Sequence, residues 1–304
     1  MNKILICVLG PTASGKTSLA IDIAKYFKTE IISTDSRQFY REMSIGTAKP
    51  TKEELSQVKH HFIDSLSVET KYTAGEFEHD ALKTISKLFE TKDVVVMAGG
   101  SGLYINAILF GIDPFPEISK EIRTKILNLF KEKGLEGIKD ELRKLDPEFY
   151  CEVDLDNPRR IMRAIEVCWA SGTTYSSFRK EKPKKRDFKV IKIAYDYDRQ
   201  VLYERINKRV DIMIKEGLEK EVHSLIKYKD YLALSTIGYK EFFSYFNGEI
   251  DKETAIELIK RNSRRYAKKQ LTWFRKDEEI NWINPKIDKQ MFLQELEKEI
   301  ERLK

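Results

Sequence analysis

The residues best suited to chemistry in this sequence form one continuous run near its N-terminus. The run consists of Gly10, Pro11, Thr12, Ala13, Ser14, Gly15, Lys16 and Thr17. Two glycines enclose four residues and are followed by Lys and Thr, which is the spacing of a phosphate-binding P-loop. In such a loop, successive backbone N–H groups point at phosphate oxygens. Lys16 is expected to contact the terminal phosphate, and the Thr17 hydroxyl is expected to hold Mg²⁺.

The residues on either side of this run support the same interpretation. The apolar run Ile4–Leu9 predicts a buried strand, and Lys16–Lys28 predicts a helix. The N-terminus of that helix would add the positive end of its dipole to the anion site. The alternative is a chance match in an ordinary Gly-rich turn, which leaves the strand and the helix unexplained. The run by itself does not identify the phosphate compound that it binds.

A carboxylate at the end of the next predicted strand is the second candidate group. The strand Glu30–Asp35 ends on Asp35, and the polar residues Ser36, Arg37 and Gln38 follow it. In a parallel sheet, chemistry collects beyond the C-terminal ends of the strands, so we expect Asp35 beside the P-loop. There it could act as a general base. The alternative is a helix cap or a buried partner for a nearby hydroxyl.

A second Gly-rich turn follows the third predicted strand. Residues 93–97 are predicted to form this strand, and Gly99, Gly100, Ser101 and Gly102 come after it. An ATPase usually has an acidic residue here to bind the metal and position water. Its absence argues against an NTP-hydrolysing motor. The glycines favour a loop that lets a ligand approach the backbone closely, with Ser101 as a hydroxyl donor.

These elements predict an α/β fold, with a P-loop NTPase-like parallel sheet flanked by helices and a helical insertion domain. Residues 1–113 and 188–304 would form the catalytic core, and residues 114–187 the insertion. Within the insertion, Asn157 and Pro158 predict a helix start, and Arg159 and Arg163 share one face of that helix. Arginines near the positive end of a helix indicate an external anion. A solvated basic face is the alternative.

The segment Lys260–Lys276 contains no acidic residue, and aromatic residues are interleaved with its basic ones. A helix of this composition is typical of a nucleic-acid contact. A membrane surface or simple solubility are the alternatives. We see no clean apolar stripe in this segment, which favours RNA or DNA.

The composition bounds the class of protein. The chain has 304 residues, of which 41% are hydrophobic and 34% charged, as in soluble globular proteins. Cys7, Cys151 and Cys168 form no CxxC pair, which favours reduced thiols and a reducing compartment. The sequence shows no signal peptide and no apolar run long enough to cross a bilayer. We therefore expect a cytoplasmic protein that binds no membrane, and nothing in the sequence requires more than a monomer.

Two hypotheses follow from the residues. One is a small-molecule kinase that uses ATP at the P-loop, with Asp35 as the base for an acceptor hydroxyl. The other is a nucleic-acid-modifying transferase whose P-loop binds a diphosphate leaving group. Only the second uses the basic segment near the C-terminus. A non-catalytic RNA-binding protein would leave the P-loop and Asp35 unexplained.

From Leu5 to Trp282 the chain resembles the tRNA dimethylallyltransferase (tRNA isopentenyltransferase) family, in its bacterial form. Several separate blocks in the family's order carry the resemblance: Gly10–Thr17, Ile31–Pro50, His60–Asp64, Gly99–Ile105, Asn157–Val167, Ile237–Lys240 and Arg264–Arg275. One departure is Ser101, where the family more often has Thr, and the hydroxyl is retained.

The resemblance implies transfer of a dimethylallyl group from dimethylallyl diphosphate to N6 of adenosine-37, in tRNAs that read codons beginning with U. It implies that Asp35, Lys16 and Thr17 are catalytic, that Mg²⁺ binds at Thr17, and that Arg209 joins the P-loop in binding diphosphate. The positions that match tRNA contacts of the family are Asp35, Ser36, Arg37, Gln38, Ser101, Arg123, Arg159, Arg160, Ile161, Met162 and Arg163. Prenyl transfer to a free adenine nucleotide remains an alternative, because a related branch of enzymes shares the P-loop.

Overall fold

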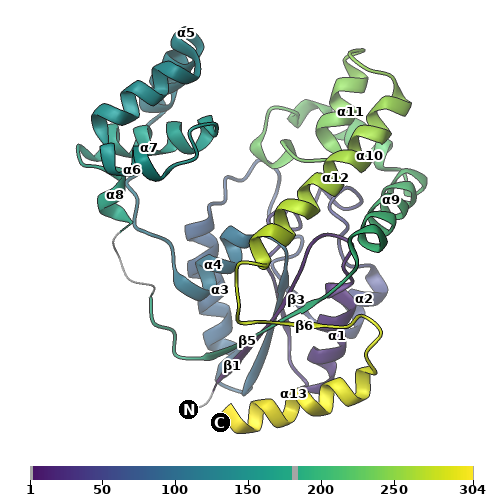
Figure 1. Cartoon of the computed structure of the whole chain (residues 1–304). Helices are drawn as coiled ribbons and strands as arrows, with labels where there is room; N and C mark the ends of the chain where they lie inside the picture. The colour runs from purple at the N-terminus through teal and green to yellow at the C-terminus, as the bar shows by residue number, and fades with distance from the viewer. Residues whose placement is uncertain (1–2, 180–183, 304) are drawn as a thin grey trace. The chain divides into compact units, whose positions relative to one another are not determined.

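The computed structural model describes residues 3–179 and 184–303. The chain divides into two units, coloured by residue number in Figure 1. Residues 1–110 and 185–304 form the core unit, and residues 111–184 form the insertion.

The core unit contains a six-stranded, all-parallel sheet, which confirms the predicted α/β fold. Its strands are β1 (Ile4–Leu9), β2 (Ile31–Ser33), β3 (His60–His61), β4 (Val94–Gly99), β5 (Lys189–Tyr195) and β6 (Ile280–Ile283), in the spatial order β3-β2-β4-β1-β5-β6. Leu9, the last residue of β1, lies opposite Gly99 of β4 and Ala194 of β5. The carboxyl ends of these three strands therefore meet at one edge of the sheet.

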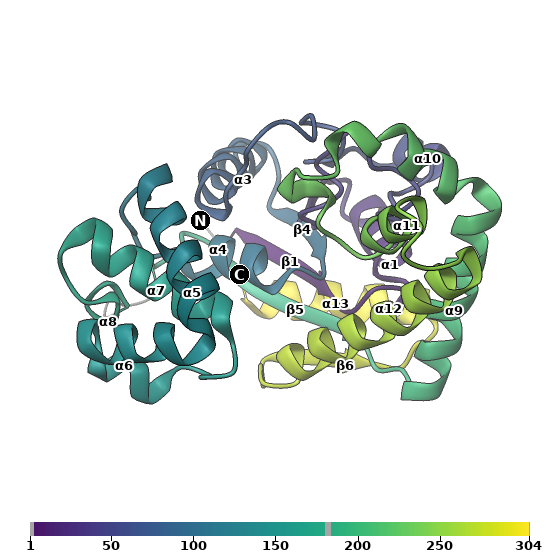
Figure 2. The same cartoon turned by 90° about the horizontal axis from the view of Figure 1, so that it is seen from above.

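Both faces of the sheet are covered, because alternate residues of each strand point to opposite sides. Leu5, Cys7 and Leu9 of β1 pack in one cluster with α3 (Ala74–Phe89) and α4 (Gly102–Phe110). The intervening residues of β1 pack in another cluster with α1 (Lys16–Tyr26) and α13 (Lys289–Leu303). Figure 2 shows α3 and α13 on opposite sides of the strands. This two-sided burial explains why the strands read as continuous apolar runs.

Two helices of the core unit begin with capping boxes. Thr73 accepts a hydrogen bond from the backbone N–H of Glu76, whose carboxylate accepts one from the N–H of Thr73. Thr51 and Glu54 repeat the arrangement at the start of α2 (Lys52–Gln57). Each cap contributes about 1 kcal/mol to helix stability. The box at Thr73 begins α3.

The part of the core unit that follows β5 is mostly helical. It contains α9 (Arg199–Glu216), α10 (Leu218–Ser224), two short 3-10 helices (Ile226–Tyr228 and Leu232–Leu234), α11 (Tyr239–Phe246) and α12 (Lys252–Phe274). The predicted basic segment lies in the C-terminal part of α12. Within the predicted segment the buried residues of this helix are Ala267, Gln270 and Phe274, so its buried side includes a polar residue and is not a clean apolar stripe. Because many basic residues stand between these positions, the sequence alone does not indicate which side of the helix is buried.

The insertion consists of α5 (Lys120–Leu145), α6 (Pro147–Glu152), α7 (Pro158–Ser171) and α8 (Tyr175–Phe178), around an apolar core of its own. Gly134 interrupts α5 with a φ of 62°. Asn157 caps α7 by accepting a hydrogen bond from the N–H of Arg160, and Gly172 ends the helix in the left-handed conformation. The start of α7 is therefore as the sequence predicts. Among the described residues of the whole chain, we find no helix long and apolar enough to span a membrane.

Candidate functional site

The run Gly10–Thr17 connects β1 to α1 at the carboxyl edge of the sheet. Gly15 precedes α1 with a φ of 86°, a conformation that glycine adopts without strain. The hydroxyl of Ser14 is buried and has no hydrogen-bond partner among the described residues. A buried polar group without a partner is costly, and a phosphate oxygen would supply the missing one. The loop therefore fits an anion.

Lys16 and Arg209 bring two positive charges to this loop from α1 and α9. The Lys16 ammonium donates a hydrogen bond to the Pro11 carbonyl oxygen at 3.3 Å. Burial lowers the pKa of Lys16 to about 8; attraction to the Asp35 carboxylate opposes this shift, and repulsion from Arg209 adds to it. Burial also lowers the pKa of Arg209, again with Asp35 acting in the opposite direction. A bound anion would favour the charged form of both groups.

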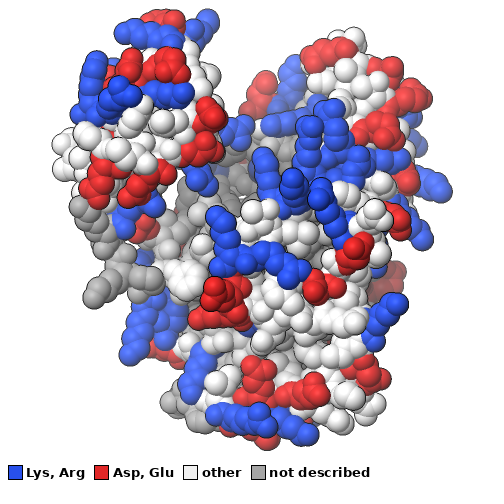
Figure 3. All heavy atoms as spheres, viewed as in Figure 1, with Lys and Arg blue, Asp and Glu red and all other residues white. Residues whose placement is uncertain are grey.

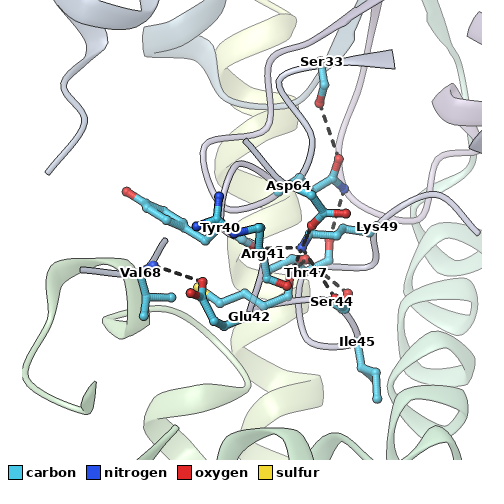
Figure 4. A network of polar contacts seen from close by, with 12 residues as sticks. Ser33, Tyr40, Arg41, Glu42, Ser44, Ile45, Thr47, Lys49, Asp64 and Val68 are labelled. Atoms are coloured by element: carbon cyan, nitrogen blue, oxygen red, sulfur yellow. Dashed lines mark hydrogen bonds and ion pairs between the residues drawn. The ribbon is translucent and has the colours of Figure 1, made fainter. Parts of the chain in front are cut away.

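Asp35 lies two residues beyond β2, and its Oδ1 accepts a hydrogen bond from the backbone N–H of Arg37 at 3.0 Å. Side chains brace the segment that follows, as Figure 4 shows. Lys49 donates to the Tyr40 carbonyl oxygen at 2.6 Å and pairs with Asp64. The Gln38 amide donates to the carbonyl oxygens of Thr47 and Ala48 at 3.2 and 3.1 Å. The backbone around Asp35 is therefore held in one arrangement.

One pocket brings the predicted groups of the core unit together. Lys16, Thr17, Asp35 and Arg209 all line it. The other lining residues are Thr12, Ile31, Ser33, Gln38, Thr47, Ala48, Pro50, His60, Ile63, Ala98 and Gly99. Hydroxyl and carboxylate oxygens from Thr17 and Asp35 are the kind of ligand that Mg²⁺ prefers. The pocket thus combines an anion site, a candidate base and apolar walls.

The second Gly-rich turn differs from expectation in what approaches it. A Cβ atom at Gly100 would lie 2.5 Å from the Gln270 amide nitrogen, and one at Gly102 would lie 2.8 Å from the Trp273 ring. The protein's own α12 therefore occupies the space beside Gly100 and Gly102. Gly99 of the same turn lines the pocket, so close approach of a ligand to this turn stays a prediction there. Ser101 contacts the loop after Asp35, because its hydroxyl accepts a hydrogen bond from the Ser36 N–H at 3.5 Å.

Two residues that hold these loops were not identified from the sequence. Gln270 contacts both the P-loop and the second Gly-rich turn. Glu221 accepts hydrogen bonds from the successive N–H groups of Ser44, Ile45 and Gly46 and from the Tyr239 hydroxyl. One feature of the sequence could have indicated that Gln270 faces the protein interior: it is an uncharged residue at helical spacing from the buried Ala267 and Phe274. No feature of the sequence indicates the role of Glu221, since its partners in the loop lie at least 175 positions away.

The outer side of α12 is strongly basic. Figure 3 shows Lys and Arg side chains gathered over this helix. Its exposed basic residues include Arg261, Arg265, Lys268 and Lys269. These four residues are called the α12 cations below. Such a concentration of exposed positive charge suits a polyanion.

The remaining candidates lie in the insertion. Arg123 is exposed on α5, and Arg159 and Arg160 are exposed in the first turn of α7. Arg163 is partly buried and pairs with Glu166 at 3.4 Å. Met162 packs against the core of the insertion, and Ile161 is fully buried in it. The Ile161 side chain therefore stabilises the insertion, and a contact between this position and tRNA, which would have to use the backbone, stays a prediction.

Comparison with known proteins identifies one family. A sequence model described as IPP transferase matches residues 38–277. A tRNA dimethylallyltransferase of Christiangramia forsetii is 51% identical over 283 residues, covering 93% of this chain and 94% of the relative.

Solved structures give the same result. The full-length tRNA isopentenylpyrophosphate transferase of Bacillus halodurans matches with a TM-score of 0.73 and 34% identity, over 100% of this chain and 97% of that chain. A eukaryotic dimethylallyltransferase described as acting on tRNA matches with a TM-score of 0.74 and 25% identity. That match covers 90% of this chain and 70% of the eukaryotic one.

Proposed function

The chain belongs to the IPP transferase family, and we propose that it transfers a dimethylallyl group from dimethylallyl diphosphate to N6 of adenosine-37 in tRNA. The acceptors would be tRNAs that read codons beginning with U, and the products N6-(dimethylallyl)adenosine and diphosphate. One observation carries the proposal: Lys16, Thr17, Asp35 and Arg209 line a single pocket. That pocket can bind a diphosphate and remove a proton at the same place.

Asp35 would act on the acceptor. The exocyclic N6 is a weak nucleophile because its lone pair is delocalised into the adenine ring. The Asp35 carboxylate would orient the amino group and accept one N6 proton while N6 forms a bond to the allylic carbon. The bond between that carbon and the diphosphate oxygen breaks, and its electron pair leaves with the diphosphate. The hydrogen bond from Arg37 N–H keeps the carboxylate oriented for this role.

The P-loop would act on the leaving group. Its backbone N–H groups, the positive end of α1, Lys16 and Arg209 would stabilise the negative charge that develops on the diphosphate. Mg²⁺ is part of the proposal, and Thr17 would hold it. When bound, the ion would neutralise diphosphate charge. The apolar atoms of Ile31, Pro50 and Ile63 in the same pocket suit the hydrocarbon part of the donor.

The surfaces around the pocket suit RNA as the acceptor. Adenosine-37 must leave its stack in the anticodon loop to reach Asp35. Ser36, Arg37, Gln38 and Ser101 lie next to Asp35 or contact the loop that carries it, so they are placed to contact the base and its neighbours. The α12 cations would bind phosphates of the stem-loop. A free nucleotide would need none of these basic residues, so this feature favours tRNA over the free-nucleotide alternative.

We also propose that the enzyme acts in the cytoplasm as a monomer. Cys7 and Cys168 are free and buried, and Cys151 is free and exposed, which suits a reducing compartment.

A labelled-donor assay with two acceptors tests the function. The purified protein, Mg²⁺ and radiolabelled dimethylallyl diphosphate are mixed with an anticodon stem-loop carrying A36-A37-A38, or with AMP. We expect label in the stem-loop and its loss when A37 is replaced by G. Label in AMP alone would show a free-nucleotide enzyme. Turnover of ATP without label in either acceptor would show a kinase.

The two arginines of α7 give a prediction about tRNA binding. Arg159→Gln with Arg163→Gln should weaken stem-loop binding and reduce the magnitude of the slope of log K against log salt by about one to two. The reason is that RNA binding releases fewer counterions when fewer phosphates are contacted. Turnover at saturating RNA should stay unchanged. Lys131→Gln with Lys144→Gln removes the same charge from exposed positions of the insertion and is the matched control. A salt slope equal to that of the wild type in the arginine variant would show that α7 does not bind phosphate.

A further inference from the structure

Gln270 connects the two Gly-rich loops of the core unit. Its amide nitrogen donates a hydrogen bond to the Gly100 carbonyl oxygen at 2.8 Å, and its amide oxygen accepts one from the Thr12 N–H at 3.1 Å. Gln270 is only 8% exposed; its bond to Gly100 is buried, and its bond to Thr12 is partly buried. One buried amide therefore links the P-loop to the turn that follows β4.

This contact decides which P-loop N–H groups remain for a ligand. The Thr12 N–H is bonded to Gln270 and so is already engaged within the protein. On the other side of the loop, the Arg205 guanidinium donates to the Ala13 carbonyl oxygen at 2.8 Å. The loop is thus held from outside by α12 and α9. Within the loop, the Ser14 N–H donates to the Pro11 carbonyl oxygen at 3.4 Å. Contacts from outside the loop therefore help to set the arrangement that a diphosphate would meet.

The fit around Gln270 is too close for simple space filling. A Cβ atom at Gly100 would lie 2.5 Å from its amide nitrogen and 2.9 Å from the Gly10 carbonyl oxygen. Only glycine at this position lets the three segments meet. An apolar side chain would fill the same space but would leave the Thr12 N–H and the Gly100 carbonyl oxygen without partners, which is unfavourable in a buried site.

The same helix carries the α12 cations on its outer side. Tyr266, Gln270 and Trp273 follow one another at helical spacing, so they share one face of α12. Trp273 lies against Gly102, and Gln270 reaches the P-loop. A displacement of α12 by bound RNA would therefore be transmitted to both Gly-rich loops through these side chains.

We propose that Gln270 is a positioning residue that couples RNA binding at α12 to the diphosphate site. It fixes the P-loop against the turn after β4, so that RNA bound on the outer side of α12 favours the loop arrangement that binds diphosphate. The coupling rests on the proposed function, because it requires RNA and diphosphate as ligands. By linkage, diphosphate should strengthen RNA binding by the same factor.

Calorimetric titration with inorganic diphosphate and Mg²⁺, with and without the anticodon stem-loop, tests the proposal. In the wild type, the stem-loop should tighten diphosphate binding about fivefold or more. Gln270→Met keeps the side-chain length but removes both hydrogen bonds. It should weaken diphosphate binding about tenfold or more and bring the coupling factor close to one. The affinity for the stem-loop alone should not change.

Gln270→Glu gives an intermediate case, because a carboxylate can still accept from Thr12 but cannot donate to Gly100. Gln294→Met, at an exposed position of α13 in the same unit, is the matched control and should behave as the wild type. Circular dichroism and thermal unfolding show whether each variant folds; if Gln270→Met does not, Gln270→Glu should itself show weaker diphosphate binding and reduced coupling.

Two results would overturn the proposal: a wild-type coupling factor of one, or equal coupling in the wild type and the folded Gln270 variants. Prenyl transfer is measured separately on the wild type. Failure of the proposed function would appear there, whereas failure of the coupling appears only in the titrations.

Discussion

Asp35→Asn is expected to slow prenyl transfer in a single turnover by about 10²-fold or more, and to leave stem-loop affinity within about twofold of the wild type. Asn has the shape of Asp, and its carbonyl oxygen can still accept the hydrogen bond that the Arg37 N–H donates at 3.0 Å. The loop should therefore keep its conformation. The variant lacks only the group that accepts the N6 proton. Rapid-quench measurements with enzyme in excess over RNA report this step directly.

Asp230→Asn provides the control, because Asp230 is an exposed carboxylate of the same unit and lies outside the pocket. Its single-turnover rate should equal that of the wild type. A normal rate in Asp35→Asn would exclude Asp35 as the base. A reduced rate accompanied by equally reduced RNA affinity would instead indicate a role in binding the acceptor.

The features that could be predicted from the sequence are those that depend on neighbouring residues. Ile4–Leu9 forms a strand because six consecutive apolar side chains are buried there. Thr73 and Glu76 begin α3, and Asn157 and Pro158 begin α7, because each cap requires only side chains within one helical turn. The family resemblance drawn from separate motifs is confirmed for the same reason, since each motif is a local pattern in a fixed order.

The two edge strands were not predicted. β3 has two residues, and β6 (Ile280–Ile283) is an edge strand with the exposed Asn281 at its second position. An edge strand has one neighbour and need not be apolar on both faces, so its pattern is weak.

The candidate site likewise contains some residues whose placement could be predicted from the sequence and others whose placement could not. The rule that ligands bind beyond the carboxyl ends of parallel strands predicted that Asp35 would lie near the P-loop. The residues that fix the two loops were beyond any local rule. Gln270 lies 258 positions from Thr12 and 170 from Gly100, so only the folded chain brings them together. The basic residues of α12 identified this helix in the sequence, but they lie on its exposed side and give no information about the buried side that carries Gln270.

Lys16→Met is expected to reduce kcat/KM for dimethylallyl diphosphate by about 10² to 10³-fold, the cost of removing one group that stabilises developing negative charge. Met retains the length of the side chain but carries no charge and donates no hydrogen bond. The Lys16 ammonium has Pro11 as its hydrogen-bond partner within the loop, so it is already held at the phosphate site. In this variant, Arg209 would still supply a positive charge to the diphosphate, and Ser14 and the backbone N–H groups would supply uncharged hydrogen-bond donors.

The loss should fall on both kinetic constants, because Lys16 would contact the diphosphate before the reaction and more strongly as the carbon–oxygen bond breaks. The KM for the donor should rise, and kcat at saturating donor should fall. Lys25→Met, at an exposed position of the same helix, should change neither. A KM and a kcat that both match the wild type in Lys16→Met would refute the diphosphate role of the loop lysine. A change in KM alone would mean that Lys16 binds the donor and the leaving group equally, so that stabilisation of the departing diphosphate comes from Arg209 and the α1 N-terminus.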